Sequence, residues 1–386
     1  MANMMDYLKW RGDLPLAVSP WNEVDSLIMA AFSYNPLPGE EVRGSEGRTL
    51  RELAALSDLA EREGNLYFHQ WRALFFAMAD TVRYGDMRLH DYVEDIAEDK
   101  QFSAVAADLS DGSTFLAFRG TDNSLVGWKE DFHMSYESPV PAQSAAVEYL
   151  ERLAGCGRPL RLSGHSKGGN LAAYAAVEAR PLVQDQLLSV CSFDGPGLPD
   201  ELLNSVAYAR IRSRILSVVP QTSVVGMLMG YHPDYLVVHS DKTGIYQHDA
   251  FSWHIEGPGA FCLEEDVDVQ SRILCEGVHA WLKDCTPEER EEFVGAMFDM
   301  AEATEARTTA EISEKKLQSA AAMLTALRKM EPETRKLFFD LIGRMVGDTS
   351  SAAWSFFSRR ATEAFGRLPF ARKDDKNDQP EEPAHA

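Results

Sequence analysis

The stretch LRLSGHSKGGNLAAYAA, residues 160–176, constrains the fold more than any other part of the sequence. An apolar run stops abruptly at GHSKG (residues 164–168), and the small residues that follow predict a helix. This order matches the G-x-S-x-G pattern, in which a sharp strand-to-helix turn raises a serine hydroxyl above the edge of a sheet. The alternative is an ordinary glycine-rich turn between a strand and a helix. Because both flanks of the motif fit the strand-turn-helix context, we interpret Ser166 as the nucleophile.

The segments around this motif alternate between strand and helix patterns. FSAVAADLSDGSTFLAFRGT (residues 102–121) predicts a hairpin, because two apolar stretches are divided by Ser-Asp-Gly-Ser. SAAVEYLERLAG and LPDELLNSVAYARI predict helices, whereas LLSVCSFDGPG, RILSVVPQ and YLVVHS predict further strands. Such alternation is typical of the α/β class, with a mostly parallel sheet covered by helices on both faces.

Changes in composition and hydrophobic pattern along the chain predict four regions. A chain of 386 residues with 45% hydrophobic content can bury one enzyme-sized core and carry additions to it. The C-terminal end, KDDKNDQPEEPAHA, has almost nothing to bury and is expected to be disordered. The predicted regions are a helical leader packed on the core (1–70), the core (71–285), a helical extension (286–368) and a disordered charged tail (369–386).

The net charge and the cysteine pattern limit the cellular locations and the binding partners that we expect. The formal net charge of −22 argues against nucleic acid as a partner, because phosphate binding needs a basic surface. The cysteines are odd in number and form no Cys-x-x-Cys pair, so we expect reduced thiols. No run approaches the roughly 20 apolar residues of a bilayer span, and the first residues lack the order of a signal peptide. A cytoplasmic location is the resulting expectation.

Residues 350–373 differ from the rest of this acidic chain. They carry five Arg or Lys residues against one glutamate, and aromatic residues are interleaved with them. A basic aromatic helix of this kind can lie on an anionic membrane surface. The alternative is a helix that docks its aromatic residues on the protein's own core. Peripheral membrane contact through this segment therefore stays one of two interpretations.

Several motifs together carry a resemblance to a known family. GHSKGG, with FRGT about 45 residues earlier, resembles the class 3 lipase branch of the α/β hydrolases. More closely, DYLKWRGDL, GHSKGGN, FDGPGL and QHDAFSW together resemble the Mbeg1-like group of bacterial lipase-like proteins. The resemblance implies an α/β-hydrolase fold. It also implies that Thr121, which follows Arg-Gly, and the backbone N–H of Lys167 form the oxyanion hole.

A serine nucleophile needs a histidine to take its proton and an acid to orient that histidine. In this fold the chain order is serine, acid, histidine. His248, in a loop after the last predicted strand, is our choice for the base, with His254 as its main rival. No carboxylate follows the strand RILSVV, where the class 3 pattern has one, so Asp194 at the end of the preceding strand is our choice for the acid.

Other residues than Asp194 could be the acid of the triad. Asp194 could merely cap the tight Gly-Pro-Gly turn that follows it, as aspartates often do. In that case Asp234 or Asp241 would be the acid, whereas Asp249, directly beside His248, would usually point away from it.

The sequence thus predicts a serine esterase or lipase-like hydrolase that acts on a small-molecule or lipid acyl ester. No cofactor is expected, because no cluster of residues has metal-ligand spacing and there is no phosphate-binding glycine loop. Two alternatives remain: a hydrolase-fold protein that binds an acyl ligand without turnover, and a peptidase or acyltransferase with the same triad.

Overall fold

A nine-stranded sheet forms the centre of the computed structural model, with the strand order β1-β2-β3-β4-β5-β6-β7-β8-β11. Strands β4 to β8 are parallel, and the strands outside them pair antiparallel. The strands are β1 (Arg48–Thr49), β2 (Arg88–Ile96), β3 (Gln101–Asp108), β4 (Thr114–Phe118), β5 (Leu160–His165), β6 (Leu187–Phe193), β7 (Ile215–Pro220), β8 (Leu236–Val238) and β11 (Leu263–Glu264). Strands β9 (Ile255–Glu256) and β10 (Ala260–Phe261) form a separate pair.

The structure describes residues 2–56, 68–97, 100–121, 134, 138–223, 225–227, 234–242, 244–257, 259–269, 271–272, 286 and 288. The predicted helical extension apart from residues 286 and 288, the predicted tail and the basic segment 350–373 lie outside the described residues. Over the described range, the predicted α/β class with a mostly parallel sheet and helices on both faces is confirmed.

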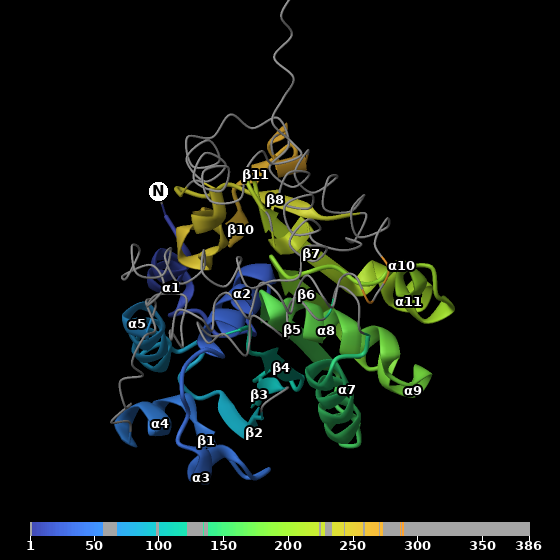
Figure 1. Cartoon of the computed structure of the whole chain (residues 1–386). Coiled ribbons are helices and arrows are strands. Elements are labelled where there is room, and N and C mark those ends of the chain that lie inside the picture. Colours follow the sequence, from blue (N-terminus) through green and yellow to red (C-terminus); the bar gives the residue numbers. More distant parts are fainter. Residues whose placement is uncertain are drawn as a thin grey trace, which may run out of the picture.

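The order of the parallel strands explains how the helices are distributed. Strands β4 to β8 lie side by side in sequence order, and right-handed connections between them place the intervening helices on one face of the sheet. That face packs against helices α7 and α8 and the short α11 (Figure 1). The helices after the first half of the sheet are α7 (Pro141–Ala154), α8 (Lys167–Glu178), α9 (Pro181–Gln184), α10 (Asp200–Leu203) and α11 (Val206–Ile211).

The opposite face must therefore be covered by helices from elsewhere in the chain. Helices α1, α2 and α5 lie on that side in Figure 1 and join the same hydrophobic cluster as the sheet. The helices of this part are α1 (Met4–Arg11), α2 (Glu23–Phe32), α3 (Gly39–Val42), α4 (Leu50–Leu56) and α5 (Phe68–Ala79). In α2 nearly every residue is buried, which follows from its place between the sheet and the other helices.

The division of the chain into a leader, a core, an extension and a tail stays a prediction.

Strand β4 illustrates why the apolar runs are continuous rather than alternating. Phe115 and Ala117 belong to the cluster under α2, whereas Leu116 and Phe118 belong to the cluster under α7 and α8. All four side chains are fully buried. Because neighbouring residues of a strand point to opposite faces, a strand covered on both sides has to be apolar at every position.

A buried carboxylate ties the first helices to the chain that follows. Asp25 on α2 accepts hydrogen bonds from the Tyr7 hydroxyl at 3.1 Å and from the Arg83 Nε at 2.7 Å, and the Tyr84 hydroxyl also donates to it. A buried charge is tolerated only with such partners. The network therefore fixes α1 and α2 to the turn that precedes β2.

Two local features differ from the sequence-based expectation. Strand β2 precedes the predicted hairpin, and the helix predicted over residues 198–211 is divided into α10 and α11. The division falls at Ser205, whose hydroxyl accepts the backbone N–H of Tyr208 at 3.0 Å and so begins a new helix.

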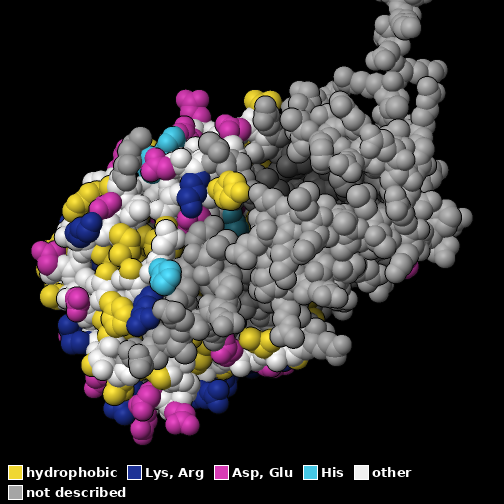
Figure 2. Space-filling model, turned by 60° about the vertical axis from the view of Figure 1, so that its left-hand side comes forward, with side chains coloured by type: hydrophobic (Ala, Val, Ile, Leu, Met, Phe, Trp, Pro, Cys, Tyr) yellow, Lys and Arg dark blue, Asp and Glu magenta, His cyan; other side chains and the backbone are white. Residues whose placement is uncertain are grey.

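The described surface is polar, with hydrophobic side chains scattered among charged ones. Figure 2 shows acidic and basic side chains interspersed over the described part of one face. None of the helices described is both long enough and apolar enough to span a bilayer. Cys156, Cys191 and Cys262 are free thiols.

Candidate active site

Ser166 lies at the corner between β5 and α8, with φ of 58° and ψ of −134°. A non-glycine residue in this region is strained, and such strain is characteristic of functional turns. The backbone N–H of Ser166 donates to the Phe193 carbonyl at 2.9 Å, which holds the corner against the end of β6. A side chain at Gly164 would collide with the Gly168 backbone, and one at Gly168 with the Phe118 carbonyl. The corner therefore requires glycine on both sides.

Asp194 lies at the end of β6 and is also strained, with φ of 47°. Its backbone N–H donates to the Val218 carbonyl at 2.8 Å. The buried carboxylate accepts hydrogen bonds from the Ser223 hydroxyl at 2.5 Å and the Gly226 N–H at 3.0 Å. Its second oxygen, Oδ2, lies 2.5 Å from Nδ1 of His248. The structure thus brings Asp194 and His248 together, and the carboxylate does more than cap a turn.

The pKa of Asp194 reflects two opposing effects. Burial raises the pKa of this carboxyl, but the neighbouring His248 and the hydrogen bonds from His248 and Ser223 lower it more strongly. The net result is a pKa below the usual value for aspartate. The carboxylate is therefore ionised at neutral pH and can stabilise a positive charge on His248.

His248 ends the short 3-10 helix Gly244–His248 and faces the serine corner. Its ring packs at a tilt of 36° against that of His165, the residue before Ser166, with ring centroids 4.5 Å apart. With Nδ1 donating to Asp194, Nε2 is left with a lone pair that can accept a proton. Among the described residues, no hydrogen bond joins the Ser166 hydroxyl to His248, and the Ser166 side chain does not cap α8. In ligand-free hydrolases this bond is often long and tightens only when substrate binds.

The rival residues from the sequence have other partners. His254 lies 2.7 Å from Asp241, and Asp234 pairs with Arg212 at 2.6 Å on the surface. Asp249 accepts a hydrogen bond from Lys242 at 2.5 Å.

The proposed oxyanion donors come from two segments: Lys167 directly follows Ser166, whereas Thr121 precedes it by about 45 residues. Gly120 packs so closely on the Tyr34 hydroxyl and the His165 carbonyl that no side chain would fit there, and Thr121 is the next residue. Lys167 is the first residue of α8, so its backbone N–H lies at a helix N-terminus, where negative charge is favoured. Gly120, the neighbour of Thr121, thus packs on the residue before Ser166, and the role of Thr121 and Lys167 in binding an oxyanion stays a prediction.

His165 was missed as a functional residue, because the sequence motif treats its position as variable. Its Nε2 donates to the carbonyl of His248 at 2.8 Å, and the Tyr34 hydroxyl lies 3.0 Å from its Nδ1. His165 and Tyr34 therefore hold the backbone that carries the candidate base. No local sequence signal could have revealed contacts that join residues this far apart in the chain.

His165 predicts a specific pH dependence of stability. Burial, together with the nearby His248, lowers the pKa of His165 from 6.5 to about 3. The unfolded chain takes up this proton below about pH 6.5, whereas the folded chain does so only near pH 3. The stability that the neutral His165 ring gives to the folded chain is thus fully present above pH 6.5 and is lost as the pH falls toward 3. At pH 5 the free energy of unfolding should be lower by about 2 kcal/mol for this reason.

Urea unfolding at pH 7.5 and pH 5.0 measures this effect. The His165→Asn variant, which lacks the titrating group, should lose about 2 kcal/mol less than the wild type over this interval. Equal losses in the two proteins would contradict the assignment of His165 as a buried neutral histidine.

Comparisons with known proteins agree with the motifs. The model of the Mbeg1-like family matches residues 78–299. No curated protein gives a significant match to the sequence. Together with the parallel strands and their crossover helices, the strained serine corner makes this an α/β-hydrolase fold.

Several solved structures are also similar to the chain. They include the Rhizomucor miehei lipase propeptide complex (15% identity, TM-score 0.29), with 41% of this chain and 58% of that chain covered. Lipase II from Rhizopus niveus has 16% identity and a TM-score of 0.32, with 46% and 72% covered. M37 lipase has 14% identity and a TM-score of 0.34, with 54% and 70% covered.

Proposed function

The chain belongs to the Mbeg1-like family, and we propose that it is a serine esterase or lipase-like hydrolase that cleaves an acyl ester through Ser166, His248 and Asp194. One observation carries the proposal. A buried, ionised carboxylate fixes the ring of His248 beside the strained corner that carries Ser166. The buried carboxylate and the strained corner each cost folding free energy on their own. Together with His248 they have the arrangement that activates a serine hydroxyl.

In the proposed mechanism, Asp194 holds His248 in the tautomer with a proton on Nδ1. His248 Nε2 removes the proton from the Ser166 hydroxyl as its oxygen attacks the ester carbonyl carbon. The carbonyl oxygen becomes an oxyanion, which accepts hydrogen bonds from Thr121 and the Lys167 N–H. The intermediate collapses, the C–O bond of the ester breaks, and His248 gives its proton to the departing alcohol. Water then attacks the acyl-enzyme by the same steps and releases the acid.

Acyl esters are the favoured substrates because FRGT and GHSKGG resemble the corresponding segments of class 3 lipases. The same three residues could also serve a peptidase or an acyltransferase, since the triad does not select among acyl transfers. No metal ion or organic cofactor takes part in the proposed chemistry.

A series of p-nitrophenyl esters of graded acyl length tests this function with the purified full chain. We expect hydrolysis well above the buffer rate, with kcat/KM highest for one range of acyl lengths. If no ester in the series is hydrolysed, the esterase proposal is wrong. The alternative of a hydrolase-fold protein that binds acyl ligands without turnover would then gain support, and ligand binding would be the next measurement.

A further inference from the structure

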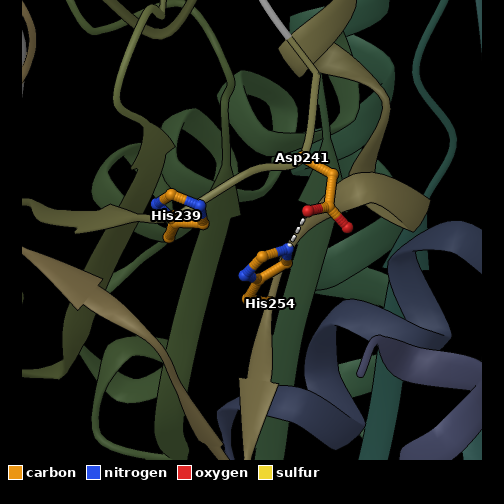
Figure 3. A group of neighbouring side chains, drawn as sticks. All are labelled: His239, Asp241 and His254. Carbon is orange, nitrogen blue, oxygen red and sulfur yellow. Dashed lines mark ion pairs between the residues drawn. The ribbon is translucent and has the colours of Figure 1, made fainter. Parts of the chain in front are cut away.

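A cluster of three side chains lies outside the proposed active site, beyond the end of β8. His239, Asp241 and His254 face one another there (Figure 3), and their potential ligand atoms all lie within 4.8 Å of one another. None of the three takes part in the proposed hydrolysis. Two imidazoles and one carboxylate are a donor set that first-row divalent metal ions bind well.

The backbone holds these three residues in a fixed frame. The N–H of His254 donates to the His239 carbonyl at 2.8 Å, and the N–H of Asp241 donates to the Ser252 carbonyl at 3.0 Å. Cys262 links the two segments that carry the histidines. Its N–H donates to the His254 carbonyl, and its carbonyl accepts the N–H of His239. Ligands on a rigid frame are pre-organised, so a metal ion would not have to order the chain.

His254 shows why the cluster is costly without a cation. Its side chain is only 3% exposed, and neither ring nitrogen makes a hydrogen bond of good geometry to a described residue, although Nε2 lies 2.7 Å from Asp241 Oδ1. The rings of His239 and His254 lie 4.5 Å apart, so one ion could accept a lone pair from each ring.

His239 is already oriented as a ligand. Its Nδ1 lies 2.5 Å from the Glu264 carboxylate, and a proton shared there leaves the lone pair on Nε2. A carboxylate that fixes the tautomer of a ligating histidine is the usual outer shell of a metal site. Zinc bonds of about 2.0–2.2 Å place tetrahedral ligand atoms about 3.4 Å apart. Ligand atoms up to 4.8 Å apart must therefore close by up to about 1.4 Å, and the 2.7 Å contact between His254 and Asp241 must open by about 0.7 Å. Both shifts are within reach of His239 and Asp241, whose side chains are 31% and 53% exposed.

We propose that His239, Asp241 and His254 bind one divalent transition-metal ion of the zinc type, with water in the remaining position. Magnesium and calcium are disfavoured, because both prefer oxygen ligands. Asp241 and His254 flank residues 242–253, so the ion would clamp the base of the segment that carries His248. The role of that clamp in catalysis rests on the proposed function, but metal binding itself does not.

Zinc titration of the chelator-treated, dialysed full chain tests the site by calorimetry and thermal denaturation. We expect one zinc ion per chain and a melting temperature that rises with zinc but not with magnesium. His239→Ala and Asp241→Asn should each weaken zinc binding at least tenfold. Glu264→Gln, which removes only the outer carboxylate, should weaken it about 10- to 100-fold. These variants avoid the buried His254, whose replacement could prevent folding.

Three control variants keep the result interpretable. Cys262→Ser removes the neighbouring thiol, and His69→Ala removes an exposed histidine on α5; both should bind zinc as the wild type does. Ser166→Ala should also retain binding, which separates failure of the hydrolase proposal from failure of the metal site. The proposal is overturned if zinc does not bind below millimolar concentration, or if His239→Ala and Asp241→Asn bind it unchanged. In that case the contact between His254 and Asp241 is a structural one that holds no metal ion.

Discussion

Replacing Ser166 with alanine is expected to lower kcat for ester hydrolysis by about 10⁶-fold. The substitution removes the oxygen that attacks the carbonyl and leaves the buried pair of Asp194 and His248 in place. The measurement is hydrolysis of the best p-nitrophenyl ester found in the graded series, at saturating substrate. Thermal unfolding of the variant should match that of the wild type, because alanine adopts the same corner with no larger side chain.

Ser205→Ala is the matched control, because it removes a serine hydroxyl that only caps α11. It should cost about 1 kcal/mol of stability and leave kcat unchanged. If Ser166→Ala kept activity within tenfold of the wild type, Ser166 would not be the nucleophile.

Asp194→Asn should lower kcat by about 10⁴-fold, the effect known for neutralising the acid of such a triad. An asparagine amide can still accept the hydrogen bonds from Ser223 and Gly226 through its oxygen, so the fold should persist. Its NH₂ group, however, would face Nδ1 of His248 and favour the tautomer that leaves Nε2 protonated. A protonated Nε2 cannot take the proton from Ser166.

Asp234→Asn is the control for this change, since that carboxylate pairs with Arg212 on the surface. It should retain activity close to that of the wild type. A 10⁴-fold loss in Asp234→Asn or Asp241→Asn, with an active Asp194→Asn, would place the acid elsewhere and overturn the proposed mechanism.

The serine corner was predictable from sequence because its determinants are local. An apolar strand, two required glycines and a run of small residues lie within 17 positions, and the helix and strand around them follow the predicted order. Chain order predicts His248 as the base, and the lack of a carboxylate after β7 predicts Asp194 as the acid. The hydrogen bond that joins the two residues could only be seen in the fold.

Other features escaped prediction for physical reasons. Strand β2 has charged residues and a register shift between His90 and Val93, so it lacks a clean alternating pattern. The ligands of the proposed metal site come from two separate segments and converge only through the backbone bonds around Cys262. The support of the His248 backbone by His165 is likewise a long-range contact. Periodicity and short motifs report on neighbours in sequence, and they carry no signal for such contacts.

Labelling with a fluorophosphonate probe tests the central claim most directly, because only an activated serine reacts with it. The measurement is mass spectrometry of the labelled full chain after proteolysis, with Ser166→Ala and His248→Ala treated in parallel. The account predicts one phosphonate adduct, on the peptide that contains Ser166, with no adduct in Ser166→Ala and a strongly slowed reaction in His248→Ala. An unlabelled wild-type chain with intact fold, or an adduct on a different serine, would contradict it.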